Sequence, residues 1–220
     1  MNYIEILNNG KNFLKKNKIK NPILDSELLL SKVLNKSREE ILLNSNYILK
    51  KQEINTFNSY LLRRKYNEPI AYILGFKYFW KYKFITNKSV LIPRPDTELI
   101  VEECLKYLPN NKSKKILDIG TGSGCIIISI LKERSKCIAT ALDLSNKALN
   151  VAKSNAKLHQ LENKINFINI DIDKYNSCNY DLIISNPPYI NNVDLSRLDD
   201  DIKFHEPKIA LSGGFDGFRD

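Results

Sequence analysis

Apolar residues recur with helical spacing over residues 3–66. The pattern is clearest in two stretches, with apolar faces at Leu28, Leu29 and Val33 and at Ile54, Phe57, Leu61 and Leu62. Between the two stretches, Ser37 and Glu40 have the spacing of a capping box ahead of a further helix. The first third of the chain is therefore predicted to be helical.

The pattern changes between Phe76 and Ile92, where aromatic and β-branched residues are dense. This composition predicts a β-hairpin, with Asn87–Ser89 as its turn. The prolines of the segment 93–95 favour an extended backbone. Asp96 is then predicted to cap a helix over 97–108.

From Lys114 onward, short apolar runs alternate with helical patterns. Strands are predicted at 116–119, 137–144, 165–170 and 180–185. Helices are predicted at 125–133 and 146–159, the second capped by Ser145. Alternation of this kind predicts an α/β fold, a doubly wound, Rossmann-like parallel sheet.

A glycine loop of five residues directly follows the first of these strands: Gly120-Thr121-Gly122-Ser123-Gly124. Glycines permit a close backbone approach to a ligand, and the helix that follows favours an anionic group at its N-terminus. Asp143 ends the next strand, where a carboxylate can bind ribose hydroxyls. A dinucleotide such as NAD is one interpretation, and a turn without a ligand is another. The spacing GxGxG, with Asp118 before it, favours S-adenosylmethionine.

A second motif, the proline turn Asn186-Pro187-Pro188-Tyr189, follows the last predicted strand. A planar amide or amino nitrogen is a poor nucleophile because its lone pair is delocalised. The side-chain oxygen of Asn186 and the carbonyl of Pro187 can accept its two N–H groups and orient it. Tyr189 can cover the flat face of the substrate. Such a site needs no general base, since the proton can leave after the methyl group arrives.

Composition narrows the class of protein. The chain has 220 residues, 43% of them apolar, which is enough for a substantial core. No run reaches the roughly 20 apolar residues of a membrane span, and the N-terminus lacks a signal-peptide pattern. We therefore expect a cytoplasmic protein with no membrane partner. The four cysteines lack metal-binding spacing, so we expect reduced thiols and no metal; they are Cys104, Cys125, Cys137 and Cys178.

The net charge of +9 is unevenly distributed. Residues 1–89 carry 17 Lys and Arg against 7 Asp and Glu, whereas residues 90–220 are nearly neutral. Lysine, isoleucine and asparagine are all abundant, so A/T-rich codons are one explanation of the charge. The other is an acidic partner, either a nucleic acid or an acidic protein surface.

Together with the proline turn, three further stretches resemble the HemK/PrmC family of release factor glutamine methyltransferases. The first is the linker, which consists of Glu68–Gly75 and Leu91–Glu98; the second is Glu206-Pro207, and the third is Ala210–Gly217. The resemblance runs from about Asp25 to the last residue. It implies transfer of a methyl group from S-adenosylmethionine to the glutamine amide in the Gly-Gly-Gln motif of peptide chain release factors.

The resemblance also implies roles for individual residues. The donor is expected to bind Asp118, the glycine loop from Gly120 to Gly124 and Asp143, with Asp171 and Ile172 near the adenine and Asn186 close by. The family often has an aromatic residue at the position of Ile172. The glutamine amide is expected at Asn186, Pro187, Pro188 and Tyr189, of which Asn186, Pro187 and Tyr189 are the catalytic candidates. Lys81 stands where the family commonly has a glycine.

Three domains are expected: a helical substrate-docking domain over 1–67, a hairpin linker over 68–95, and the methyltransferase domain over 96–220. The family continues beyond the last of these stretches with one more helix and three more strands, whereas this sequence ends at Asp220. We therefore expect an incomplete sheet, an unpaired edge on the strand 180–185, and a truncated chain of low stability or activity. Two alternatives stay open: an adenine-N6 or guanine-N2 methyltransferase of nucleic acid, and an inactive fragment that binds the donor.

Overall fold

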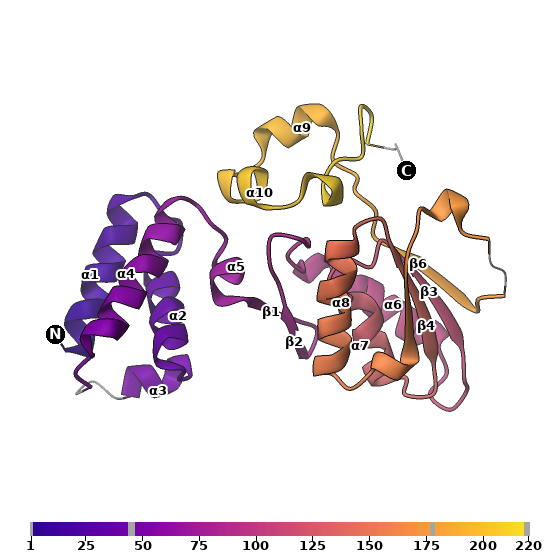
Figure 1. The fold of residues 1–220 in the computed structure, drawn as a ribbon, viewed down its shortest axis with the longest axis horizontal. Coiled ribbons are helices and arrows are strands. Elements are labelled where there is room, and N and C mark those ends of the chain that lie inside the picture. Colours follow the sequence, from indigo (N-terminus) through magenta and orange to yellow (C-terminus); the bar gives the residue numbers. More distant parts are fainter. Residues whose placement is uncertain (1, 44–46, 177–178, 218–220) are drawn as a thin grey trace. The chain divides into compact units, whose positions relative to one another are not determined.

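The computed structural model describes residues 2–43, 47–176 and 179–217. The chain divides into two compact units, Met1–Leu74 and Gly75–Asp220. Figure 1 labels their helices and strands.

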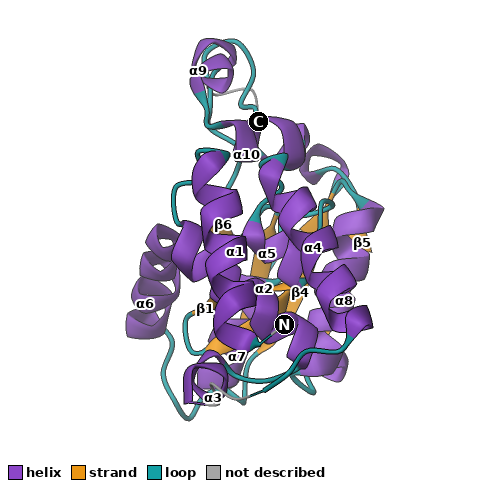
Figure 2. Cartoon of the chain, turned by 90° about the vertical axis from the view of Figure 1, so that its left-hand side faces the viewer, coloured by secondary structure: helices purple, strands orange, loops and turns teal. Residues whose placement is uncertain are grey.

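The first unit is a helical bundle. Its helices are α1 (Tyr3–Lys16), α2 (Pro22–Leu34), α3 (Arg38–Leu43), α4 (Lys51–Lys65) and α5 (Ile70–Leu74). Helices α1, α2 and α4 lie side by side in both views (Figures 1 and 2). Their shared core includes Leu14, Leu29 and Phe57, all fully buried. Gly10 lets α1 approach α4 closely, because a Cβ there would lie 2.7 Å from the Phe57 ring.

Two helix starts in this unit carry reciprocal caps. Asn2 and Glu5 form a capping box at α1. The predicted box at α3 is confirmed: the Glu40 N–H donates to Ser37 Oγ, and the Ser37 N–H donates to the Glu40 carboxylate.

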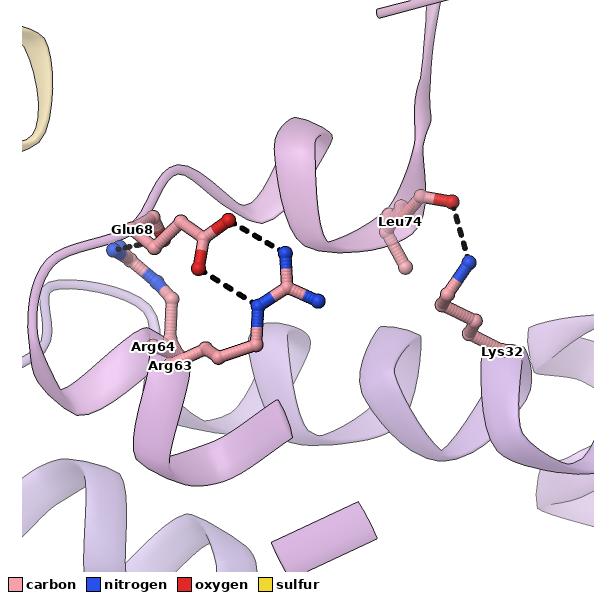
Figure 3. Close-up of polar contacts among 5 residues, drawn as sticks. All are labelled: Lys32, Arg63, Arg64, Glu68 and Leu74. Atoms are coloured by element: carbon pink, nitrogen blue, oxygen red, sulfur yellow. Dashed lines mark hydrogen bonds and ion pairs between the residues drawn. The ribbon is translucent and has the colours of Figure 1, made fainter. Parts of the chain in front are cut away.

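Side chains of α2 and α4 hold the segment that ends the bundle (Figure 3). Arg63 donates twice to the Glu68 carboxylate, at 2.7 and 2.5 Å. Arg64 donates to the Glu68 carbonyl and also pairs with buried Asp25 at 2.7 Å. Lys32 Nζ donates to the Leu74 carbonyl at 2.8 Å. Residues 68–74 are thereby fastened to the helices at both ends.

The second unit begins with a two-stranded antiparallel hairpin, β1 (Phe76–Phe79) and β2 (Tyr82–Ile85). The hairpin turns at Trp80-Lys81. The predicted turn at Asn87–Ser89 is present, because the Val90 N–H donates to the Asn87 carbonyl at 3.1 Å, but it follows β2 and does not join the two strands. Phe79 and Phe84 fix this register, because both are fully buried in the core of the second unit. Trp80 adopts φ 57°, whereas Lys81 does not need the left-handed backbone.

The helix that follows also differs from its prediction. A 3-10 turn, η1 (Pro95–Thr97), leads into α6 (Glu98–Tyr107). The helix N-cap is Thr97, without a side-chain cap, so Asp96 does not have the predicted role. The Glu98 carboxylate instead accepts the Trp80 N–H at 2.7 Å, which joins the start of α6 to the hairpin turn.

The predicted α/β class is confirmed. The parallel strands are β3 (Lys115–Ile119), β4 (Ile138–Asp143), β5 (Ile165–Asn169) and β6 (Leu182–Ser185), in the order β5-β4-β3-β6. Helices α7 (Cys125–Glu133) and α8 (Asn146–Leu158) share one core with α6 and one face of the sheet (Figure 1). Ser145 caps α8 as predicted. Among the described strands, β6 pairs only with β3, which leaves its other edge open.

Short elements complete the described part of the unit: η2 (Glu162–Lys164), η3 (Ile172–Lys174), α9 (Asn192–Arg197), α10 (Asp200–His205) and η4 (Lys208–Ala210). Within the described residues, no helix combines the length and apolar character needed to cross a bilayer. Cys104, Cys125 and Cys137 are free and buried, whereas Cys178 lies outside the described residues. Burial raises the pKa of the Cys125 thiol to about 12, so it is un-ionised at neutral pH.

Candidate active site

The two motifs meet at the carboxyl ends of adjacent strands. The glycine loop follows β3, Asp143 ends β4, and the proline turn follows β6. Because β3 lies between β4 and β6 in a parallel sheet, the loop lies between the other two segments. Ser185, just before the proline turn, donates to the Ile119 carbonyl just before the loop at 3.1 Å.

The glycine loop turns sharply at the N-terminus of α7. Its three glycines all have positive φ, which other residues rarely adopt. Gly124, the N-cap of α7, packs so closely that an added Cβ would lie 3.0 Å from the Ile128 side chain. At Gly120, by contrast, an added Cβ would meet no atom within 4 Å. The loop is therefore tight against α7 and open on its outer side.

Asp143 is bonded to the glycine loop directly. Its Oδ2 accepts the Gly122 N–H at 2.8 Å, and its Oδ1 accepts the Ser145 N–H at 2.8 Å. Burial raises the pKa of Asp143, although both backbone bonds oppose the shift. Each carboxylate oxygen has a second acceptor position, so two hydroxyl donors can still bind here.

Asp118 lies beneath the loop and is only 1% exposed. Its Oδ2 accepts the Thr121 hydroxyl at 2.7 Å. Burial raises the pKa of Asp118 to about 6; the Thr121 hydrogen bond opposes the shift and the charge of Asp143 adds to it. Thr121 and Ser123 are buried as well. Asp118 thus holds the loop from below.

A residue that the sequence analysis missed holds the other side of the loop. Asn155, on α8, is fully buried and donates to the Ser123 carbonyl at 2.9 Å. It also exchanges two hydrogen bonds with the backbone of Ile85, at 2.7 and 3.1 Å. The hairpin and the glycine loop are thus joined through one side chain. A polar residue between Ala152 and Ala156, on the apolar face of a helix, was the available signal.

The proline turn differs from the loop. Among the described residues, none forms a hydrogen bond with the side chain of Asn186, which is half-buried, and Tyr189 is 72% exposed. Neither Pro187 nor Pro188 has an N–H to donate. The Asn186 side chain therefore has no hydrogen-bond partner among the described residues, and the two prolines cannot supply one from their own backbone nitrogens.

Asp171 and Ile172 follow β5, one strand beyond β4. Asp171 accepts the Asp173 N–H at 3.1 Å and caps η3. Ile172 is 40% exposed. The structure places both residues at the same sheet edge as Asp143.

Such a fold, with a glycine loop, an acidic residue on the next strand and an Asn-Pro-Pro-Tyr turn, defines a methyltransferase. Two family descriptions match the chain: the PrmC N-terminal domain over residues 5–75 and the methyltransferase small domain over 97–199.

Curated relatives agree with this class. Proteins named release factor glutamine methyltransferase from Caulobacter vibrioides, Buchnera aphidicola and Coxiella burnetii are 39%, 38% and 42% identical to the chain. The alignments cover 94%, 94% and 90% of this chain and 72%, 76% and 70% of the relatives. The chain belongs to the release factor glutamine methyltransferase family.

The site fits S-adenosylmethionine, the methyl donor of this class. The open side of Gly120 leaves room for a ligand, and the N-terminus of α7 suits a carboxylate. Asp143 keeps acceptor positions for two ribose hydroxyls.

Proposed function

We propose that this chain transfers a methyl group from S-adenosylmethionine to the side-chain amide nitrogen of the glutamine in the Gly-Gly-Gln motif of a peptide chain release factor. The observation that carries the proposal is the open Asn186 amide, half-buried and without a partner among the described residues, at the same sheet edge as the glycine loop. The names of the relatives support the substrate.

Asn186 and Pro187 orient the side-chain amide of the substrate glutamine. The Asn186 Oδ1 and the Pro187 carbonyl each accept one N–H of the substrate amide, which turns its nitrogen toward the methyl group. The Tyr189 ring covers the amide plane. When bound, S-adenosylmethionine supplies a methyl group on a positively charged sulfur. The amide nitrogen, oriented by Asn186 and Pro187, would receive that methyl group and would then lose its extra proton to water.

The residues of the donor site have separate tasks in this proposal. Asp143 binds the ribose, and the glycine loop with the N-terminus of α7 binds the methionine part. Asp118 positions Thr121 within the loop. Asp171 and Ile172 lie along the adenine. Ile172, which is 40% exposed, packs its aliphatic side chain on the ring.

The three predicted regions also have separate tasks here. In this proposal residues 1–67 dock the release factor and 96–220 carry the donor and the reaction. The connecting residues are shared, since 68–74 belong to the first compact unit and 75–95 to the second. The positive charge of residues 1–89 favours an acidic surface on the partner. A cytoplasmic location follows from this substrate, because translation termination takes place there.

The test is a methyl-transfer assay with labelled S-adenosylmethionine. It offers a purified release factor, its Gln→Ala variant in the Gly-Gly-Gln motif, and total RNA. We expect label on the intact factor alone. Label on RNA, or equal label on the Gln→Ala variant, would overturn the proposed substrate. Calorimetry with S-adenosylhomocysteine, run in parallel, separates a chain that binds the donor without turnover from one that does not bind it.

A further inference from the structure

The returning segment Leu211–Gly217, which we call the brace, runs alongside the end of the proline turn. The Ile190 N–H donates to the Leu211 carbonyl at 3.1 Å, and the Gly213 N–H donates to the Ile190 carbonyl at 3.0 Å. One step further, the Asn192 N–H donates to the Gly214 carbonyl at 3.1 Å. These bonds form a short parallel bridge between Ile190 and Ser212.

Two glycines of the brace touch the backbone of the proline turn. A Cβ at Gly213, which is buried, would lie 2.7 Å from the Pro188 carbonyl oxygen and 2.6 Å from that of Gly217. A Cβ at Gly217 would lie 2.8 Å from the Tyr189 carbonyl oxygen, and its φ of 87° already favours glycine. Real Cβ atoms essentially never approach this closely. Because the opposing atoms belong to the backbone, no rotamer change relieves the clash.

A buried carboxylate fixes the chain just before the brace. The Glu206 side chain is 1% exposed. It accepts the Ile92 N–H at 3.1 Å and an Arg94 guanidinium N–H at 2.6 Å. Both partners precede α6 and belong to the same compact unit. The brace therefore starts from a fixed point.

The composition of the proline turn explains why an external support is needed. Residues 187 and 188 are prolines, so neither can donate a backbone hydrogen bond to hold the turn in place. Ile190 is the first backbone donor after Tyr189, and its N–H is taken by the brace. A displacement of about 1 Å in a reacting group can lower a rate by 10²-fold.

We propose that Gly213 is a positioning residue for methyl transfer: the missing side chain lets the brace seat against Pro188, and this fixes the Asn186 amide and the Pro187 carbonyl at the acceptor geometry. The proposal rests on the proposed function for its reaction, whereas the brace itself can be tested without it. Gly217 has the same role against Tyr189, the residue that follows Pro188.

The main experiment compares Gly213→Ala with the wild-type chain. We expect kcat for methylation of the release factor to fall at least tenfold. The Kd for S-adenosylhomocysteine should stay within twofold, since the nearest atoms to an added Cβ at Gly213 belong to Pro188 and Gly217 and not to the glycine loop. A control, Ile209→Ala, changes a 58% exposed side chain just before the brace and should keep kcat within twofold. A folded Gly213→Ala variant with near wild-type kcat, or one that loses donor affinity equally, would overturn the positioning role.

A second measurement tests the brace on the wild-type chain, in case the Gly213→Ala variant does not fold. In hydrogen exchange on the wild-type chain, the amides of Ile190, Asn192 and Gly213 should exchange at least tenfold more slowly than that of Phe215, whose side chain is 90% exposed. Equal rates would overturn the brace whatever the kinetics show. If the wild-type chain methylates no release factor, the proposed function fails, and hydrogen exchange alone then decides whether the brace exists.

Discussion

The glycine loop and the proline turn lie at neighbouring strand ends, yet they are held in different ways. Backbone bonds from Gly120 and Thr121 to the Leu142 carbonyl hold the loop. Side chains add to them: Asp118 and Asn155 hold it from two sides, and Asp143 accepts its Gly122 amide. The turn is held by backbone, through Ile190 and the brace, and the Asn186 side chain is left open. Donor binding and methyl transfer should therefore respond to separate substitutions.

The largest separation is expected at Asn186. Replacing it with alanine (Asn186→Ala) removes a preorganised polar contact, a change that costs about 2.7–4 kcal/mol of barrier, or roughly 10²–10³-fold in kcat. Donor affinity should not change. Single-turnover kinetics beside calorimetry measure both quantities, with the exposed Ile209→Ala as the control. An equal loss of donor affinity would remove the distinction between the two segments.

The next largest effect is expected on the free energy of unfolding, and it concerns Asp118 beneath the glycine loop. Because the pKa of Asp118 is about 6 in the folded chain and roughly 4 when unfolded, the folded state binds more protons between these values. Its contribution to stability is fully present below about pH 4 and is lost as the pH rises through about 6.

Asp118→Asn mimics the protonated form. Relative to the wild-type chain, its free energy of unfolding should therefore rise between pH 4 and pH 7.5 by up to about 3 kcal/mol. Urea denaturation at both pH values measures the difference, with exposed Asp173→Asn as the control. A difference that does not depend on pH would contradict the shifted pKa.

Asp143→Ala should have the opposite kinetic signature to Asn186→Ala. Losing a charged acceptor costs about 1.5–3 kcal/mol, so we expect donor affinity to weaken by roughly 10–150-fold. Turnover at saturating donor should change much less. Asp143→Asn keeps one oxygen for the Gly122 amide, so its donor affinity should lie between those of the wild-type chain and Asp143→Ala. A loss confined to kcat would show that Asp143 does not bind the ribose.

The smallest effect is expected at Tyr189. Losing ring contact in Tyr189→Ala should cost about 0.5–1.5 kcal/mol, by analogy with aromatic pairs, and raise KM for the release factor about 2–12-fold. Tyr189→Phe keeps the ring and should match the wild-type chain. A loss in the phenylalanine variant as large as in alanine would assign the role to the hydroxyl.

The sequence predicted the elements whose signal is local. Ser37 and Ser145 lie at helix starts as their spacing indicated, and each of the four predicted parallel strands exists within two residues of its expected ends. The strand order then brings the glycine loop, Asp143 and the proline turn to one edge. These features depend on spacing, which a single sequence displays.

The failures have a common physical cause. The residue types of Asn87–Ser89 favour a turn, and a turn is present there, but the hairpin turns at Trp80-Lys81. The buried partners of Phe79 and Phe84 decide its register instead. Asn155 was missed for the same reason, since its partners, Ile85 and Ser123, lie 70 and 32 residues away. Contacts across such distances are set by packing: the apolar face around Asn155 marks it as an unusual polar residue, but no local pattern identifies its partners.

The polar contacts drawn in Figure 3 bear on how the chain can be dissected. All of them run between residues 32 and 74, and the last ends at the Leu74 carbonyl. Gly75 comes next, with a φ of 83° and open space where a Cβ would be. A gene fragment ending at codon 74 keeps this polar network intact in one polypeptide. That junction is the place to divide the chain when its two halves are to be produced, labelled or exchanged separately.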